Sequence, residues 1–392
     1  MNWETFNPDA KVESAANVEQ VNDSQRHPVH FHGSGGEYFG IWIVNLLLTI
    51  ITLGIYSAWA TVRTRKYFYR NTEVAGSRLD FHGRGINILV GRIIAIGLFA
   101  LYSFGAYIHE YIPLIVLVAI VLLYPWLFVK SQRFRLRNTS WRGIHFDFKA
   151  DAGDVYRHLG SYLAIMAVLV ASFLYFALRP YGSGLFLFFA ALVGMMILMP
   201  LIYAAIVDLA FNNTTFGDAR MRLPSLKGKW LGTYWKTVAI YVAVIASVSA
   251  VGGIIGGLVG GGVIDEAFIT SATGVSFIVI AYVLFIALMM VPVGYWQARK
   301  LNLIFNNLDL DDCRFDAKLK AREFIKLLFT NTLLTVLSLG LAYPWIAVRM
   351  ARYQLQHIAI TGDVDQFSGR AQHSSNALGE EVASVFDLEV GL

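Results

Sequence analysis

The chain has 392 residues, of which 56% are hydrophobic and only 15% are charged. A water-soluble domain of this length needs a polar surface, so this balance excludes an ordinary soluble fold and favours a protein embedded in a lipid bilayer. The single cysteine, Cys313, excludes an intramolecular disulfide framework and cannot by itself hold a thiolate metal site.

The two ends of the chain are polar. Residues 1–38 are mildly acidic and lack the basic start and short apolar core of a signal peptide, so we expect a poorly ordered cytoplasmic tail. Residues 39–369 are predicted to form a transmembrane domain built from repeats. Residues 370–392 are predicted to form a polar C-terminal tail.

Eight segments after the N-terminal tail approach the roughly 20 apolar residues that are needed to cross a bilayer. They are 39–60, 86–108, 112–129, 159–178, 185–211, 235–263, 275–296 and 324–348. Basic residues gather in alternate loops between these segments, and the positive-inside rule places such loops in the cytoplasm. The predicted fold class is therefore an all-α polytopic membrane protein with six to eight membrane helices.

The first and last apolar segments share a pattern of residues. Asn45 corresponds to Asn331 and Gly54 to Gly340, and each glycine weakens a helix past its middle. Eight full crossings would place both termini outside, together with a basic stretch after the last segment. Two interpretations stay open. Either both segments are re-entrant hairpins, which leaves six spans and both termini inside, or all eight cross with one charge violation.

A short module recurs about five times along the chain. A typical copy has Trp or Tyr at the end of an apolar segment, basic residues spaced by three, an Asn-Thr pair and a glycine. The basic pairs are Arg63 and Lys66, Lys130 and Arg133, and Arg349 and Arg352. Each pair lies on one helical face just outside the hydrocarbon, where anionic lipid headgroups attract cations. The Asn and Thr side chains compete for backbone hydrogen bonds, so we expect them to end the helix.

Short segments that alternate apolar and polar residues follow several of these helix ends. They are 79–82, 144–148 and 313–316. A period of two is typical of a β-strand with one buried face. We therefore expect short cytoplasmic strands that pair into a small sheet under the helices.

The first copy of the module is the most specific part of the sequence. It resembles the YjgN family of bacterial inner-membrane proteins, and the resemblance covers nearly the whole chain after the N-terminal tail. The residues that carry it are Leu53-Gly54-Ile55-Tyr56-Ser57-Ala58-Trp59, Arg63, Lys66-Tyr67, Asn71-Thr72, Phe31-His32-Gly33 and Phe81-His82-Gly83. The resemblance implies a location in the bacterial inner membrane. The family is of unknown function, so it implies no catalytic or ligand-binding residue.

Polar side chains at membrane depth are candidates for function. Asn45, Arg92, Asp208 and Asn331 fall inside the apolar segments and form the candidate intramembrane polar site. An ion pair between Arg92 and Asp208 would neutralise both charges, and a proton relay is the alternative to this structural role.

The sixth apolar segment has small residues at every fourth position, namely Gly252, Gly256 and Gly260. This spacing allows close helix packing, either within the bundle or between the subunits of a homo-oligomer.

Catalytic and cofactor motifs do not stand out in the sequence. His27, His30 and His32 are close together, but no Cys or Asp completes a metal-ligand set beside them. We expect no enzyme activity, no cofactor, no metal and no nucleic-acid partner.

Two functional hypotheses follow. The first is a transporter or channel for an unidentified solute, because repeats and broken membrane segments are typical of transporters. The alternative is a scaffold that does not transport and that interacts with anionic phospholipids of the bilayer.

Overall fold

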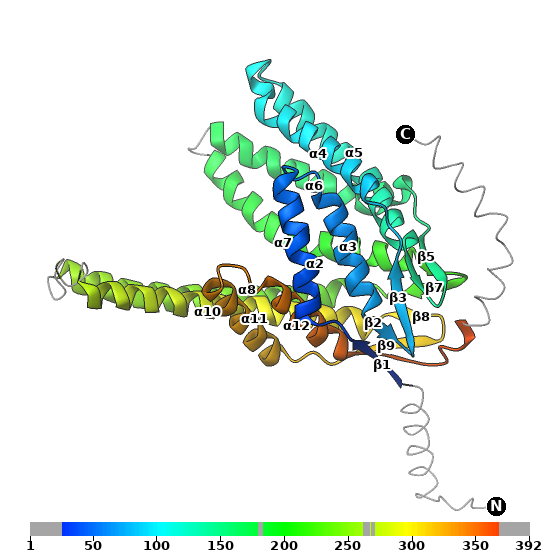
Figure 1. The fold of residues 1–392 in the computed structure, drawn as a ribbon. Helices are drawn as coiled ribbons and strands as arrows, with labels where there is room; N and C mark the ends of the chain where they lie inside the picture. The colour runs from blue at the N-terminus through cyan, green and yellow to red at the C-terminus, as the bar shows by residue number, and fades with distance from the viewer. Residues whose placement is uncertain (1–25, 179–182, 262–266, 268–270, 368–392) are drawn as a thin grey trace, which may run out of the picture.

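A computed structural model describes residues 26–178, 183–261, 267 and 271–367. Five consecutive units, each with the order strand, helix, helix, strand, make up these residues (Figure 1). The first unit contains β1 (Arg26–Phe31), α2 (Gly35–Ile51), α3 (Ser57–Arg70) and β2 (Thr72–Val74). The second contains β3 (Ser77–Phe81), α4 (Gly85–Phe104), the short η1 (Gly105–Tyr107), α5 (Ile112–Arg137) and β4 (Thr139–Trp141).

The other three units have the same order. The third contains β5 (Ile144–Phe148), α6 (Ala152–Leu178), α7 (Ser183–Asn212) and β6 (Thr214–Phe216). The fourth contains β7 (Ala219–Arg222), α8 (Lys227–Gly260), α10 (Ala272–Phe305) and β8 (Asp309–Leu310). The fifth contains β9 (Cys313–Ala317), α11 (Ala321–Leu337), α12 (Tyr343–Gln356) and β10 (Ile358–Thr361).

The strands form one closed, antiparallel barrel. Successive units are joined by tight hairpins, and β1 closes the barrel because it pairs with both β2 and β10. Two of the hairpin turns, Ala75-Gly76 and Arg142-Gly143, hold both residues at positive φ, which matches the twist of the flanking strands. Closure leaves no strand edge unpaired.

The predicted all-α fold class is therefore too narrow. The short strands expected after the helix ends are present, but they close into a barrel instead of a small sheet. The strand β1 lies inside the segment predicted to be a tail, so residues 26–31 contribute to the fold. Within the predicted 39–369 domain, residues 179–182, 262–266, 268–270 and 368–369 lie outside the described residues, as does the whole of the predicted tail 370–392.

Apolar side chains fill the barrel. The rings of Trp141, Phe216 and Phe367 lie against one another, with centroid separations from 5.4 to 6.1 Å. The segment after β10 is held there by Arg142, whose Nη1 donates to the carbonyl oxygen of Val364 (2.9 Å). The barrel is a packed core, as expected for a small barrel whose interior is filled by side chains.

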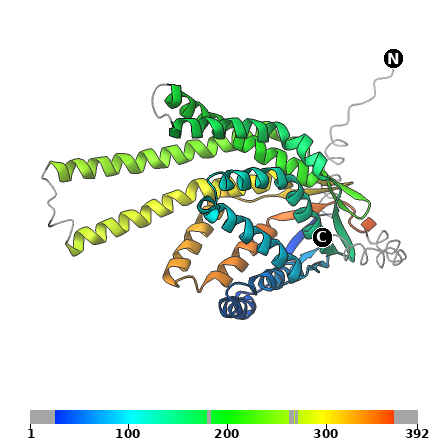
Figure 2. The ribbon, with the colours of Figure 1, turned by 90° about the horizontal axis from the view of Figure 1, so that it is seen from above.

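The helices stand around the barrel in a ring and fan outward from it (Figures 1 and 2). Each helix packs on its neighbours in the ring, and the ring closes where α12 lies against α2. At this closure the rings of Phe39 and Trp345 are 5.1 Å apart.

Six helical segments among the described residues are long and apolar enough to cross a membrane. They are Gly85–Tyr107, Ile112–Arg137, Ala152–Ser172, Gly184–Asn212, Lys227–Ile254 and Ala272–Phe305. Little of their surface is covered by protein, so apolar side chains are available to lipid on most sides. The result is a polytopic helical membrane protein.

The first and last apolar segments are short helical hairpins, which agrees with the re-entrant interpretation. The turn between α2 and α3 holds Leu53 and Gly54 at φ values of 49° and 92°. The turn between α11 and α12 holds Leu339 and Gly340 at 50° and 87°. Each hairpin therefore leaves the barrel and returns to it.

The tip of each hairpin presents apolar side chains to its surroundings. Leu53 is 94% exposed and Leu339 is 93% exposed. The backbone N–H of Gly54 donates to the carbonyl oxygen of Thr49 (2.7 Å), and Gly340 makes the equivalent bond to Thr335 (2.8 Å). A turn that satisfies its own backbone in this way is compatible with hydrocarbon.

The two described positions of the glycine stripe, Gly252 and Gly256, do not pack against another described helix. A Cβ atom at Gly252 or Gly256 would meet no other atom within 4 Å, and the surroundings of Gly260 lie outside the described residues. The hairpin of α8 and α10 diverges from the other helices, as Figure 2 shows. Packing between subunits stays a prediction.

Candidate functional site

The end of the returning helix is built in the same way in all five units. The side chains of Asn71, Asn138, Asn213 and Asn307 each donate from Nδ2 to the carbonyl oxygen four residues earlier, at 2.7–2.9 Å. In the fifth unit Nδ1 of His357 takes this place (2.7 Å). The prediction that Asn ends these helices is confirmed.

A second recurring position links the returning helices of the second and fourth units to the segment that follows the next strand. Arg133 donates to the carbonyl oxygen of Ala150 (2.8 Å). Asn302 makes the same type of bond to Leu319 (2.8 Å). These side chains hold neighbouring units together, so Arg133 has a structural role. The contact with lipid headgroups that the sequence predicts for Arg133 stays a prediction.

The four residues of the predicted intramembrane polar site do not meet. Arg92 of α4 donates from Nη2 to Oγ1 of Thr61 (2.9 Å) and from Nη1 to Oγ of Ser57, both on α3. Asp208 of α7 interacts with Ser225 instead. The expected ion pair between Arg92 and Asp208 is therefore not formed, because α4 packs beside α3 and not beside α7.

Asn45 and Asn331, the other two residues of the predicted polar site, each accept a hydrogen bond from an arginine. Nη1 of Arg63 donates to Oδ1 of Asn45 (3.2 Å), and Nη1 of Arg349 donates to Oδ1 of Asn331 (3.4 Å). Both asparagines are buried, at 5% and 4% exposure. Among the described residues, Nδ2 of each asparagine has no hydrogen-bond partner.

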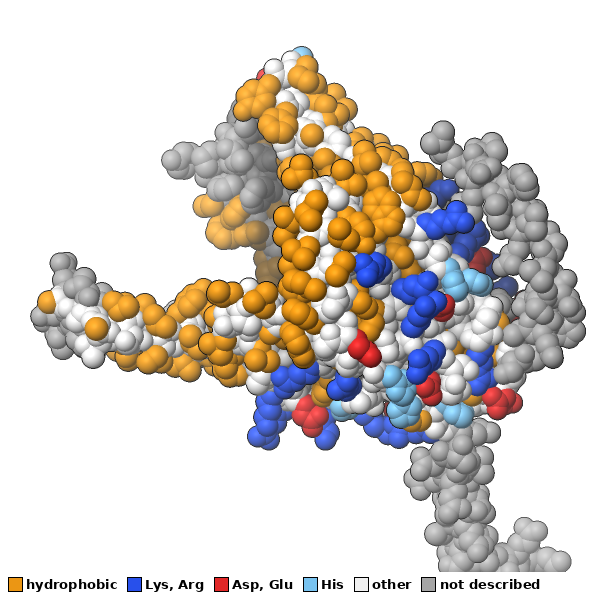
Figure 3. All heavy atoms as spheres, in the orientation of Figure 1, with side chains coloured by type: hydrophobic (Ala, Val, Ile, Leu, Met, Phe, Trp, Pro, Cys, Tyr) orange, Lys and Arg blue, Asp and Glu red, His pale blue; other side chains and the backbone are white. Residues whose placement is uncertain are grey.

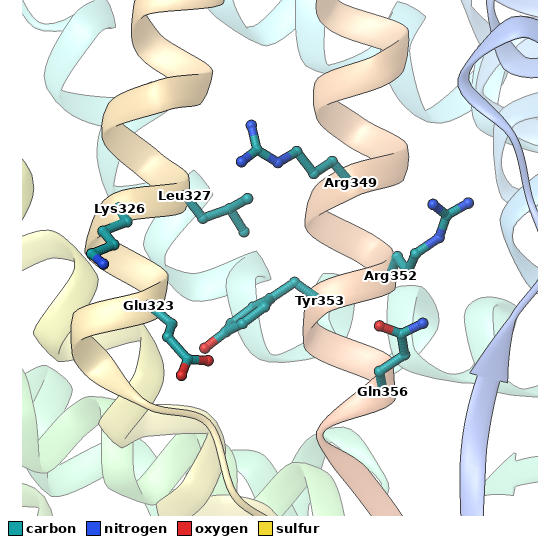
Figure 4. Close-up of a pocket in the computed structure, with 7 residues that line it drawn as sticks. All are labelled: Glu323, Lys326, Leu327, Arg349, Arg352, Tyr353 and Gln356. Atoms are coloured by element: carbon teal, nitrogen blue, oxygen red, sulfur yellow. The ribbon is translucent and has the colours of Figure 1, made fainter.

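Each of these arginines lines an open groove in its short hairpin. The first-unit groove has a volume of about 260 Å³ and is lined by Ile41, Arg63, Lys66, Tyr67, Arg70 and Asn71. The fifth-unit groove has a volume of about 390 Å³ and is lined by Glu323, Lys326, Leu327, Arg349, Arg352, Tyr353 and Gln356. Figure 4 shows Arg349 extending from α12 over Leu327 towards α11.

The two grooves are built from equivalent positions. The numbering offset between them is constant, so that Arg63 corresponds to Arg349 and Tyr67 to Tyr353. Each tyrosine hydroxyl binds the segment before the hairpin, with Tyr67 donating to the carbonyl oxygen of Ser34 (2.8 Å) and Tyr353 to that of Lys320 (3.1 Å). Sequence reasoning missed the grooves, although the likeness of the first and last segments was the signal that leads to them.

The cations that line the grooves differ from one another in their pairing. Arg70, which lines the first-unit groove, is paired with Asp80 (2.9 Å), as Arg137 is with Asp147 (2.8 Å). Within the described part of the chain, by contrast, no ion pair is formed by any of four groove cations. These are Arg63, Lys66, Lys326 and Arg349.

Basic side chains lie mainly towards the barrel, whereas apolar side chains cover the helices (Figure 3). The predicted headgroup residue Lys130 is at the barrel end of α5, where its Nζ lies 5.7 Å from the centre of the Trp126 ring. This distribution fits a membrane surface near the bases of the hairpins.

Comparisons with known proteins agree on a family and a location. The model of the family described as "Bacterial protein of unknown function (DUF898)" matches residues 26–385. The inner membrane protein YjgN of Salmonella typhimurium is 28% identical over 370 residues, and the same-named protein of Escherichia coli K12 is 26% identical over 378 residues. In both cases the match covers 89% of this chain and 92% of the relative. No solved structure matches the chain.

Proposed function

The chain belongs to the DUF898 family of bacterial proteins of unknown function and is a multi-pass inner-membrane protein, and on this premise we propose that it is a membrane scaffold that binds anionic phospholipids. In this role it does not transport solutes, and we expect no enzyme activity. Its partners are the lipids of the bilayer.

The observation that carries this proposal is the set of cations without ionic partners in the two grooves. Arg63 and Arg349 lie in hairpins whose tips are apolar, where an unneutralised charge is costly. An anionic lipid supplies the missing charge, and its acyl chains fit an apolar surface. Lys66 and Lys326, which are long and flexible, add donors at the rims of the two grooves.

The transporter hypothesis has less support. A path for a polar solute needs polar groups or water along the spans, whereas hydroxyls such as those of Ser172, Thr237 and Ser247 are bonded to the backbone of their own helices. The aromatic core of the barrel also offers no polar route through the ring. The buried amides of Asn45 and Asn331 are the feature that most favours transport.

We also infer that the five units derive from one repeated module. This origin is supported by the helix-ending hydrogen bond that recurs in every unit, made by Asn71 in the first and by His357 in the fifth. The bonds of Arg133 and Asn302 to the following unit also support it. In this view the second, third and fourth units lengthened their helices to cross the membrane, and the first and fifth kept short hairpins.

The proposal is tested by removing the unpaired charges. In the quadruple variant Arg63→Gln, Lys66→Gln, Lys326→Gln and Arg349→Gln, the amount of phosphatidylglycerol and cardiolipin that co-purifies should fall several-fold, as measured by lipid mass spectrometry. The matched control replaces four exposed barrel cations by Gln, namely Arg26, Lys149, Arg314 and Lys318. The control should keep the lipid content of the parent. Equal lipid content in all three proteins would refute the proposal.

A flux assay separates the scaffold from the transporter. Under the transporter hypothesis Arg92→Ala or Asp208→Ala should abolish solute flux in reconstituted vesicles. Under the proposal the parent protein itself produces no flux above empty vesicles, and both substitutions change only stability.

A further inference from the structure

We propose that the pairs Asn45–Arg63 and Asn331–Arg349 form two separate sites, each of which binds the phosphate diester of one phospholipid. This inference rests on the proposed function and adds the ligand group, the binding residues and a stoichiometry of two lipids per chain.

In the first-unit groove the guanidinium of Arg63 is fixed by two acceptors. Nη1 donates to Oδ1 of Asn45 (3.2 Å) and to the hydroxyl oxygen of Tyr56 (3.1 Å). Both bonds use the same nitrogen, and a guanidinium has five N–H donors on three nitrogens. Arg63 also lines the groove, so Nε and Nη2 are available to a ligand there. The planar fork of arginine matches two oxygens of a phosphate.

The fifth-unit groove repeats the pairing of an arginine with a buried asparagine on equivalent residues, whereas Ala342 takes the place of Tyr56. Asn331 is buried and accepts from Nη1 of Arg349. In Figure 4 the guanidinium of Arg349 lies between α11 and α12, above Leu327. The same pair of arginine and buried asparagine in the first and fifth units is difficult to explain as a local packing accident.

The choice of asparagine as the partner of each arginine points to an anionic ligand. A carboxylate at position 45 or 331 would hold the arginine equally well and would also neutralise it. An amide supplies the acceptor oxygen and leaves the positive charge. In addition, Nδ2 of each buried amide is without a partner among the described residues, which costs stability that a structural pair has no reason to accept.

The surroundings of each site favour a phospholipid over free phosphate. An aliphatic side chain lines each groove, Ile41 in the first and Leu327 in the fifth. Beyond each groove the hairpin ends in an exposed leucine, Leu53 or Leu339. A phosphate that carries acyl chains can therefore bind the arginine while its chains follow the apolar hairpin.

The decisive variants are Asn45→Asp and Asn331→Asp. Each keeps an acceptor oxygen for its arginine, so the fold should be retained, but each adds a negative charge that neutralises and repels the phosphate. If Asn45 and Asn331 had only a structural role, these variants would bind lipid as the parent does. Asn87→Asp is the matched control, because it makes the same change at an exposed position of α4 outside both grooves.

Native mass spectrometry of the detergent-solubilised chain with added phosphatidylglycerol counts the bound lipids. The parent and Asn87→Asp should hold two lipids that resist delipidation, each single groove variant should hold one, and the double variant none. Thermal unfolding of the same samples should show that the groove variants are at least as stable as the parent. If either Asp variant fails to fold, Arg63→Gln and Arg349→Gln replace it with the same expected counts.

The outcomes separate this inference from the proposed function. Two retained lipids in the double Asp variant would overturn the site assignment, while the proposed function would stand if the quadruple Gln variant still lost lipid. No retained lipid in the parent would overturn both. Displacement of the lipid by inorganic phosphate at the same concentration would overturn the phospholipid assignment and indicate a site for free phosphate.

Discussion

The guanidinium of Arg352 donates a hydrogen bond to the carbonyl oxygen of Gly33 (2.8 Å), and so joins α12 to the segment that precedes α2. The bond from Arg133 to Ala150 is its equivalent between the second and third units. The pairing of β1 with β10 adds a ladder at the same closure. The ring is therefore closed by side chains as well as by strands.

Removal of the closing bond should weaken the whole ring. Arg352→Met keeps much of the apolar stem and loses the charged donor to Gly33, so we expect a loss of about 1.5–3 kcal/mol, the range for a hydrogen bond to a charged group. Thermal unfolding in detergent measures the effect. Arg314→Met is the control, because its side chain is 83% exposed and its ion pair is long (3.8 Å). Equal stability of the two variants would contradict the role of Arg352.

The turn at the tip of the first hairpin should tolerate no side chain at Gly54. Its φ of 92° lies in the region where a Cβ atom is strained, so Gly54→Ala should cost about 1–2 kcal/mol. Gly91→Ala is the matched control, since Gly91 is in the middle of α4 and a Cβ there would meet nothing within 4 Å. That substitution should be neutral or stabilising by up to about 1 kcal/mol. Thermal unfolding of both variants decides whether the bend is a defined turn.

Much of this architecture could be predicted from the sequence, because its signals are local. The apolar segments, the Asn residues that end the helices and the glycines at the hairpin tips each act on neighbouring residues. Barrel closure could not be predicted, because strands as short as β8, with two residues, carry almost no periodic signal. The strand β1 was missed for a related reason, since its pairing with β10 depends on residues at the other end of the chain.

The candidate site was predicted in part for the same reason. Asn45 and Asn331 were recognised as polar residues at membrane depth, and Arg63 and Arg349 as cations near the surface. Their pairing requires α3 to fold back on α2, and α12 on α11. The expected meeting of Arg92 with Asp208 failed because equal depth along two helices says nothing about their order around a ring.

The pairing of Arg70 with Asp80 should make stability depend on pH. The hydrogen bond from Arg70 lowers the pKa of the Asp80 carboxyl below its ordinary value of 3.8 in the folded protein. A carboxyl of this kind stabilises the fold above its unfolded pKa, and the contribution is lost as the pH falls through the folded value. Asp80→Asn should therefore be less stable than the parent at pH 7, and the difference should shrink below about pH 4.

The size of this effect should be modest, under about 1 kcal/mol, because both side chains are partly exposed to solvent. Chemical unfolding at a series of pH values measures it. The double variant Arg70→Gln/Asp80→Asn isolates the pair: relative to Arg70→Gln, loss of the carboxyl should change stability little at any pH. A pH-independent deficit in Asp80→Asn would contradict the assignment.

The aromatic core of the barrel should depend on the segment after β10. Phe367→Ala removes a buried ring that lies against Trp141 and Phe216, and a change of this kind typically costs about 3–5 kcal/mol. Loss of the near-ultraviolet circular dichroism signal on heating should occur at a clearly lower temperature. Phe99→Ala is the control, because the Phe99 ring is 68% exposed on a membrane helix. A similar unfolding temperature for both variants would mean that the segment is dispensable.

Six spans and two returning hairpins require the barrel to lie on one side of the membrane, and the basic loops predict that this side is the cytoplasm. The native Cys313 is buried in the barrel, and burial raises the pKa of its thiol, so it should react slowly with maleimides and give a low background. Asp218→Cys in the exposed turn after β6 should then be protected from an impermeant maleimide in intact cells. His109→Cys, between α4 and α5, should be modified at once. Asp218→Cys should react in inverted membrane vesicles, and His109→Cys should react in detergent. Rapid modification of Asp218→Cys in intact cells would place the barrel outside the cell. That result would remove the charge argument for grooves at the cytoplasmic surface.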